Sequence, residues 1–412
     1  MGGRDPFGLG PSGWEAFAVE AGLPRYRGRQ LFDAIHRRGV TDYAAMKELP
    51  AALRERLAGE MPLRLPEVVR RDAAADGSVK FGLRLADGAL IEAVFMPGDE
   101  TRSAANEFDD ARRRDDAPSV IPRARGATDS LASRTMTSKG SLAAPGMTHQ
   151  RGPQDGKSPR FTVCLSSQTG CAVDCAFCVT GRLGGGRNLT AGEILAQLRA
   201  VLAETGHGLD GLRVVFMGMG EPFLNPEGVI PALEILFELV SPRRVTVSTS
   251  GITPAFAAFA AMPQRPNLAV SLNAADPATR ERLMPITKTY PLDGLLAAMR
   301  AWPLEPRRRI LVEYVLIAGV NDREEDARRL VRLLRGLEVK VNVIPLNEDP
   351  TWLPEWKRPA EEAIDRFVGR LAGARVTVTV RRSKGPDASA ACGQLKGRTE
   401  DPRRRVRPAG RS

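Results

Sequence analysis

Short apolar runs alternate with helical patterns along the second half of the chain. Six runs rich in Val, Ile and Leu are separated by stretches with apolar residues at helical spacing, an order typical of parallel βαβ units. The strands expected from it are 160–165, 212–217, 244–248, 267–272, 309–317 and 338–344, with a further strand over 376–380. Two packings fit this α/β pattern, an open doubly wound sheet and a partly closed barrel. Both place their active-site loops at the carboxyl ends of the strands.

The first hundred residues follow two other patterns. Apolar side chains recur at helical spacing between residues 25 and 60, which predicts a small helical domain. Apolar and polar residues then alternate over 79–97 around Asp87-Gly88, a signal for a β-hairpin. We therefore expect an N-terminal helical domain over residues 1–70 and a β-hairpin linker over 71–97. Glu92 falls on the second hairpin strand, where an isolated glutamate is usually solvent-exposed.

The composition changes between residues 98 and 159. Ala, Ser, Arg, Asp, Gly and Pro dominate there, and no apolar period is sustained. This predicts a disordered low-complexity insertion. Closing so long a loop costs only about 2–3 kcal/mol more than closing a short one, so a stable domain can carry it. The domain with the alternating strands then extends over 160–396, and a basic disordered tail follows over 397–412.

Basic residues outnumber acidic ones. The chain has 60 Lys and Arg against 49 Asp and Glu, a formal net charge of +11, which favours a polyanionic partner without identifying it. Several arginines lie in the predicted N-terminal helices, where they either contact phosphates or form a solvated face: Arg25, Arg27, Arg29, Arg37 and Arg38. No run reaches the roughly 18 apolar residues of a membrane span, and no signal peptide is evident. We expect a cytoplasmic protein with no membrane partner.

Four of the five cysteines lie between residues 164 and 178. Cys171, Cys175 and Cys178 have the spacing C-x3-C-x2-C directly after the first predicted strand, where a tight loop can aim three thiolates at one centre. Three ligands would leave one iron of a cubane cluster open to a substrate or cofactor. The alternative is a structural zinc site with Cys164 as its fourth ligand. The fifth cysteine, Cys392, stands alone in a Gly- and Ala-rich segment, where it is either a reactive thiol or a buried structural one.

Polar residues end several of the predicted strands. The segment GMGEP, with Glu221 and Pro222, ends the second strand and exposes backbone groups at its carboxyl end. On its own it could equally be an ordinary strand-to-helix turn. Later strand ends carry Ser248, Ser271, Asn273 and Asn347. Because the carboxyl ends of parallel strands open on one mouth, these residues predict a ligand site there.

The motifs together resemble those of the radical S-adenosylmethionine (SAM) superfamily. Within it, SSQTGCAVDCAFCVTG, GRNLTAGEI, GMGEPFLNP, RERLMPITKTYPL and AACGQL resemble the RlmN-type adenine-C2 RNA methyltransferases. The resemblance extends over nearly the whole chain except the segment 98–159 and the two termini. It implies a partial (β/α)6 TIM-like radical SAM barrel preceded by a small helical domain of RNA-binding type. It also implies that the chain is a SAM-dependent radical RNA methyltransferase.

The resemblance assigns roles to individual residues. Cys171, Cys175 and Cys178 would hold a [4Fe-4S] cluster that binds SAM and cleaves it to a 5′-deoxyadenosyl radical. The implied SAM contacts are Glu221, Pro222, Ser248, Ser271, Leu272, Asn273 and Asn347. Cys392 would take a methyl group from one SAM, and the radical from a second SAM would activate that methyl for addition to adenine C2. Glu92 would accept a proton, and Cys164 would release the product through a transient disulfide with Cys392.

The resemblance also suggests partners. It implies that 23S rRNA and tRNA are substrates, that an electron-donor protein such as flavodoxin supplies the cluster, and that the protein is a monomer. The family commonly has His where this chain has Asn273, and an aromatic residue where it has Leu346. Two alternatives stay open: a related enzyme that methylates adenine C8, and a non-catalytic RNA-binding protein with a structural zinc.

Overall fold

The computed structural model describes residues 5–98, 159–381 and 393–395. Its strands form one sheet in which every strand neighbours the next along the chain, from β1 to β10. The strands are β1 (Glu67–Ala73), β2 (Val79–Arg84), β3 (Leu90–Pro97), β4 (Phe161–Cys164), β5 (Leu212–Phe216), β6 (Val245–Thr249), β7 (Asn267–Ser271), β8 (Ile310–Leu316), β9 (Val339–Pro345) and β10 (Val378–Val380).

Strands β4 to β10 are parallel and form a partial barrel. Each pairs in parallel with its neighbour in the chain. A doubly wound sheet would reverse its strand order at a switch point, and no reversal occurs here. No pairing closes the sheet from β10 back to β1 among the described residues, so the barrel stays open. The six strands and the barrel-type α/β fold expected from the sequence are confirmed.

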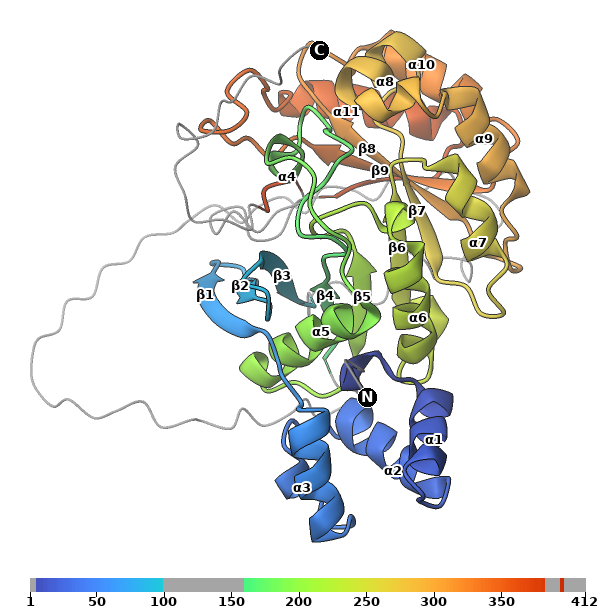
Figure 1. The fold of residues 1–412 in the computed structure, drawn as a ribbon. Helices are drawn as coiled ribbons and strands as arrows, with labels where there is room; N and C mark the ends of the chain where they lie inside the picture. The colour runs from blue at the N-terminus through green and yellow to red at the C-terminus, as the bar shows by residue number, and fades with distance from the viewer. Residues whose placement is uncertain (1–4, 99–158, 382–392, 396–412) are drawn as a thin grey trace, which may run out of the picture.

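Helices lie along one side of this curved sheet (Figure 1). They are α5 (Ala191–Thr205), α6 (Pro226–Phe237), α7 (Phe256–Ala260), α8 (Pro277–Leu283), α9 (Leu292–Ala301), α10 (Glu324–Leu333) and α11 (Glu361–Gly373). The short helix α4 (Val179–Arg182) lies apart from them, directly after Cys178. Helix α5 shows how the sequence sets their limits. Thr190 and Glu193 form a reciprocal capping box at its start, and Gly206 ends it with a left-handed φ of 68°. None of the described helices has the length and apolar composition that a membrane span requires.

The N-terminal part contains α1 (Pro11–Glu20), α2 (Tyr26–Phe32) and α3 (Ala51–Glu60), which lie below the sheet in Figure 1. Helices α1 and α2 pack closely. Gly28 permits this contact, because a Cβ atom there would lie 2.3 Å from the Trp14 carbonyl oxygen. The predicted hairpin is present as β2 and β3, but β1 extends it to three antiparallel strands. Strand β1 was not predicted from the sequence; it begins at Glu67 and so crosses the limit expected at residue 70.

The hairpin strands continue directly into the barrel. Strand β3 pairs antiparallel with β4, so that Pro97 faces Phe161 and Val94 faces Cys164. The two ends of the predicted insertion therefore meet, with the Gly98 N–H donating to the Arg160 carbonyl at 2.7 Å. Residues 99–158 and 396–412, on which the predicted insertion and tail fall, lie outside the described residues.

Strand register places the candidate residues on one face of the sheet. Directly paired residues project from the same face, and alternate residues of a strand return to it. Cys164 pairs with Val94, and Glu92 lies two residues before Val94, so Cys164 and Glu92 share a face. We call this face the inner face. Following the paired residues from strand to strand places these further residues on it: Val215, Thr246, Ser248, Ser271, Glu313 and Asn342.

Candidate active site

A cavity of about 170 Å³ opens at the carboxyl ends of the barrel strands. The cysteine loop, the GMGEP turn and the strand ends all contribute to its wall. Its lining includes Cys171, Cys175, Cys178, Gly220, Glu221, Pro222, Ser248, Ser250, Ser271, Asn273, Glu313, Asn347, Arg381 and Gly393. The carboxyl end of a barrel is where parallel α/β folds build their sites. The polar strand ends noted in the sequence therefore converge as expected.

The cysteine loop between β4 and α4 is held by backbone hydrogen bonds on both sides. The Cys171 N–H donates to the Gly184 carbonyl at 3.0 Å, and the Ala176 N–H donates to the Leu283 carbonyl at 2.9 Å. From a neighbouring loop, the Trp356 indole Nε1–H donates to the Ala176 carbonyl at 2.9 Å. The loop is thus fixed while its three thiols face the cavity.

Burial changes the acidity of these thiols. It raises the pKa of Cys171 to about 12 and raises the pKa of Cys175 well above its ordinary value. A metal centre that binds thiolates here must therefore release protons. Among the described residues, no three His, Cys, Asp or Glu side chains are arranged to hold a single metal ion. Cys164, the fourth ligand of the zinc alternative, is buried on β4 and does not line the cavity.

The GMGEP turn is more than a connection between a strand and a helix. Gly220 has a φ of 98° and lies against Gln168, both its side chain and its backbone N. The buried carboxylate of Glu221 accepts hydrogen bonds from Phe223 N at 2.9 Å and from both N and Oγ of Ser250 at 2.7 Å. Burial raises the pKa of Glu221, and these hydrogen bonds lower it in part. The turn after β5 is thereby tied to the turn after β6.

The implied SAM contacts fall into two groups. Glu221, Pro222, Ser248, Ser271, Asn273 and Asn347 line the cavity. Leu272 does not: its side chain is fully buried in the hydrophobic core. Asn273 has a φ of 60°, and its side chain accepts from Val315 N at 2.9 Å and donates to Met284 Sδ at 3.1 Å. The amide of Asn273 thus connects two segments of the cavity wall.

The remaining predicted residues are Cys392 and Glu92, of which the structure describes only Glu92. Cys392 is outside the described residues, but Gly393, which directly follows it in the chain, lines the cavity. The Gly393 carbonyl accepts from Val179 N at 2.7 Å, directly after the cysteine loop. Glu92 is only 4% exposed and lies 3.6 Å from Lys80 Nζ, so it is not the solvated edge that its isolation in the sequence suggested. The disulfide between Cys164 and Cys392 stays a prediction.

Two features of the site were missed in the sequence. Arg280 is buried on α8 behind the strand ends, and it shares a helix face with Leu283 and Met284. A basic residue in an apolar stripe was the signal that could have revealed it. Glu313 and Arg381 both line the cavity, with Oε1 and Nη1 separated by 3.8 Å. A charged residue inside a predicted buried strand was the corresponding signal for Glu313.

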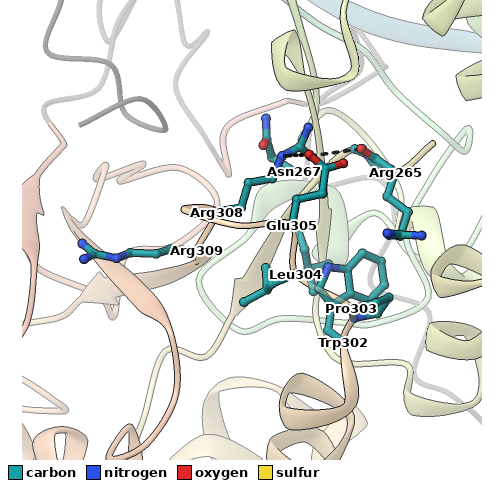
Figure 2. A pocket seen from close by; sticks show the side chains of 10 residues that line it. Arg265, Asn267, Trp302, Pro303, Leu304, Glu305, Arg308 and Arg309 are labelled. Atoms are coloured by element: carbon teal, nitrogen blue, oxygen red, sulfur yellow. Dashed lines mark hydrogen bonds and ion pairs between the residues drawn. The ribbon is translucent and has the colours of Figure 1, made fainter. Parts of the chain in front are cut away.

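A second hollow lies at the opposite, amino end of the barrel strands (Figure 2). Its volume is about 10 Å³, room for about one water molecule. Arg308 there donates to the Arg265 carbonyl and pairs with Glu305 at 3.1 Å. The hollow is too small for a nucleotide or a cofactor, so the cavity at the carboxyl end is the candidate active site.

The residues of the large cavity fit a [4Fe-4S] cluster with bound SAM. Among the described residues three cysteines and no fourth line the wall, which matches a cluster that leaves one iron accessible. The backbone and hydroxyl groups of the strand ends beside them can receive the polar parts of SAM. Cys171, Cys175 and Cys178 would hold the cluster.

Comparisons with known proteins agree with this reading. Residues 7–62 match the ribosomal RNA large subunit methyltransferase N-terminal domain, and residues 165–331 match the radical SAM superfamily. Members of that superfamily use a [4Fe-4S] cluster and SAM, the cofactors expected from the sequence.

Relatives match almost the whole chain. The probable dual-specificity RNA methyltransferase RlmN of Koribacter versatilis is 39% identical over 92% of this chain and 97% of its own length. The dual-specificity RNA methyltransferase RlmN of Sorangium cellulosum is 42% identical over 93% of each chain. The crystal structure of a radical SAM methyltransferase from Sphaerobacter thermophilus, 37% identical, covers 96% of this chain with a TM-score of 0.76. The predicted resemblance is confirmed, and the chain belongs to the RlmN family of radical SAM RNA methyltransferases.

Proposed function

We propose that this protein methylates C2 of adenine in RNA, at an adenosine of 23S rRNA in the catalytic centre of the ribosome and at the adenosine 3′ of the anticodon in some tRNAs. The observation that carries the proposal is the shared cavity. It brings together the three thiols of the cysteine loop, the polar strand ends and Gly393, the neighbour of Cys392. The names of the relatives, dual-specificity RNA methyltransferases, support RNA as the substrate class.

The reaction needs a covalent methyl carrier. Adenine C2 is electron-poor and has no lone pair with which to attack a SAM methyl group directly. A thiolate attacks such a methyl readily, so Cys392 takes a methyl group from one SAM and carries it. When bound, the cluster and a second SAM supply the 5′-deoxyadenosyl radical that removes hydrogen from this S-methyl group. The carrier carbon then bonds to adenine C2.

Two residues complete the turnover. Glu92 accepts the proton that leaves C2 as the adduct gives up its unpaired electron, which the oxidised cluster, when bound, would take back. Cys164 then attacks the sulfur of Cys392, and the bond between that sulfur and the carrier carbon breaks. The carbon takes the proton from Glu92 to become a methyl group, and the methylated RNA is released as a Cys164–Cys392 disulfide forms. Their shared inner face and burial support these roles. An external reductant must reopen the disulfide before the next turnover. We further propose that an electron-donor protein such as flavodoxin reduces the cluster and that the enzyme acts as a monomer.

The N-terminal helices are proposed to contact RNA phosphates. The side chain of Arg25 is largely exposed and that of Arg29 is half-exposed, although Arg25 pairs with Glu15 at 2.7 Å and Arg29 with Glu238 at 4.0 Å. If several such contacts form, the affinity for RNA should fall steeply with salt, with a log–log slope of about 0.7–0.9 per phosphate contact. A slope near zero in a titration from low to physiological salt would remove this surface from the RNA site.

Mass spectrometry of nucleosides tests the proposal. The protein, reconstituted without oxygen and supplied with reductant, SAM and RNA, should produce 2-methyladenosine. Formation of 8-methyladenosine would favour the C8 enzyme, and a zinc protein without iron would favour the non-catalytic alternative.

Cysteine variants test the assigned roles. Cys392→Ala should yield no methylated adenine, because the methyl carrier is lost. Cys164→Ala should instead retain RNA covalently bound to Cys392. The double variant is the matched control: it should neither methylate nor trap RNA. Normal product release by Cys164→Ala would contradict the resolving role.

A further inference from the structure

A buried arginine beside the cysteine loop carries a charge that no acidic side chain balances. Arg280 lies on α8 and is 1% exposed. None of the ion pairs between described residues includes Arg280, whose hydrogen bonds go to backbone carbonyls and one hydroxyl group. A charge taken out of water is costly unless an opposite charge lies nearby. The fold therefore keeps a cation here for a reason beyond packing.

The hydrogen bonds of Arg280 connect the strand ends behind the cavity. Its Nη2 donates to the Ser250 carbonyl at 2.7 Å and to the Ser271 carbonyl at 3.3 Å, and its Nε donates to the Leu272 carbonyl at 3.1 Å. Nη1 donates to Thr287 Oγ1 at 2.7 Å. The guanidinium thus connects the turn after β6 to the turn after β7 through hydrogen bonds to their backbone carbonyls. With both Nη2 protons and Nε occupied, it has no bidentate face left for a carboxylate or phosphate ligand.

The charge of Arg280 acts on the cysteine loop. Helix α8 ends at Leu283, whose carbonyl accepts from Ala176 N at 2.9 Å, between Cys175 and Cys178. Burial lowers the pKa of Arg280 to about 10, and negative charge on Cys175 raises it. The carboxylates of Glu221 and, for Cys171, of Asp174 add negative charge to the same region. Arg381 also lines the cavity, but it pairs with Glu313 at 3.8 Å. Arg280 is in no ion pair between described residues, so its charge can compensate thiolates at this loop.

We propose that Arg280 is a positioning residue that provides the counter-charge for an anionic iron–sulfur cluster on Cys171, Cys175 and Cys178. The proposal rests on the cluster of the proposed function. A cluster held by three thiolates gains negative charge when it accepts an electron. A fixed cation close by stabilises that reduced state, and net charge is one of the determinants of cluster potential. Arg280 would therefore make the cluster easier to reduce.

Arg308 provides the matched comparison. It is also largely buried, and burial lowers its pKa as well. Unlike Arg280, it pairs with a carboxylate, Glu305, and lies at the amino end of the barrel (Figure 2). Replacing Arg308 therefore removes a buried guanidinium of the same chemistry far from the cysteine loop.

The test measures the cluster itself. Wild type, Arg280→Gln, Arg280→Lys and Arg308→Gln are reconstituted anaerobically, and iron content and the midpoint potential are determined by a redox titration followed by EPR. Arg280→Gln should shift the reduced-to-oxidised ratio at a fixed potential about tenfold towards the oxidised form, about 59 mV for one electron. Arg280→Lys keeps the charge and should stay near wild type, as should Arg308→Gln.

The outcomes separate this inference from the proposed function. A wild type that binds no iron would defeat the proposed function and this inference with it. A wild-type potential in Arg280→Gln would overturn the inference alone. If Arg280→Gln binds no iron, Arg280→Lys decides: normal iron and potential support the counter-charge, whereas loss of iron there as well would assign Arg280 to hydrogen bonding and overturn the proposal.

Discussion

Replacing Gly220, which lines the cavity, should destabilise the fold by an amount that can be worked out from its backbone conformation and its neighbours. Gly220 has a φ of 98°, and a Cβ atom added there would lie 2.6 Å from Gln168 Cβ and 2.8 Å from Gln168 N. A side chain at such a φ costs about 1–3 kcal/mol. Relieving a clash with backbone costs about 1–3 kcal/mol more. Gly220→Ala should therefore lower the free energy of unfolding by about 2–6 kcal/mol, a large part of a typical domain's stability.

Urea denaturation of the apoprotein measures this loss as a lower transition midpoint at unchanged slope. Since Gly220 lines the cavity, the reconstituted variant should also bind SAM at least tenfold more weakly in equilibrium dialysis. Gly294→Ala is the control. Gly294 lies inside helix α9 with no atom within 4 Å of an added Cβ, so alanine there should stabilise by about 0.5–1 kcal/mol. A Gly220→Ala protein as stable as wild type would refute the close approach to Gln168.

Two further variants test the fold around the site. His36 is 1% exposed, and burial, followed by the charge of Arg199, lowers its pKa to about 3. Below about pH 6.5 the histidine is protonated in the unfolded chain but stays neutral in the folded chain. The free energy of unfolding therefore decreases as pH falls, by about 1.4 kcal/mol at pH 5.5. His36→Leu should remove that part of the pH dependence between pH 7.5 and 5.5, and an unchanged dependence would assign it elsewhere. Arg187 joins Asp87 of the hairpin turn to Glu193 of α5 at 2.7 and 2.6 Å. Because these side chains are substantially exposed, Arg187→Gln should lower the free energy of unfolding, measured by thermal denaturation, by only about 1 kcal/mol or less. A decrease above about 3 kcal/mol would contradict the expectation that solvent weakens these ion pairs.

The sequence predicted the barrel because its signals are local. The six strands are runs of Val, Ile and Leu, and the hairpin turn is marked by Asp87-Gly88, so each can be found without knowing its neighbours. The convergence of Glu221 with Ser248 and Ser271 could be expected because parallel strands end at one edge.

The parts that sequence reasoning missed depend on contacts between distant segments. The burial of Glu92 arises because β3 pairs with β4 across the segment 98–159, and no local pattern announces that pairing. The buried side chain of Leu272 could not be foreseen either, because only the packing of the sheet shows that its chain neighbours Ser271 and Asn273 line the cavity; its contact with SAM stays a prediction. The proposed role of Arg280 could not be predicted from the sequence, because it depends on α8 packing behind the cysteine loop.

The central claim is that Cys171, Cys175 and Cys178 hold a cluster that opens one iron to SAM. It is tested most directly by chromatography of 5′-deoxyadenosine released by the anaerobically reconstituted protein with reductant, SAM and RNA. We expect wild type to bind four irons per chain in the cluster and to release 5′-deoxyadenosine, and Cys175→Ala to do neither. A wild-type protein that releases none, or a Cys175→Ala protein that releases as much as wild type, would contradict the account.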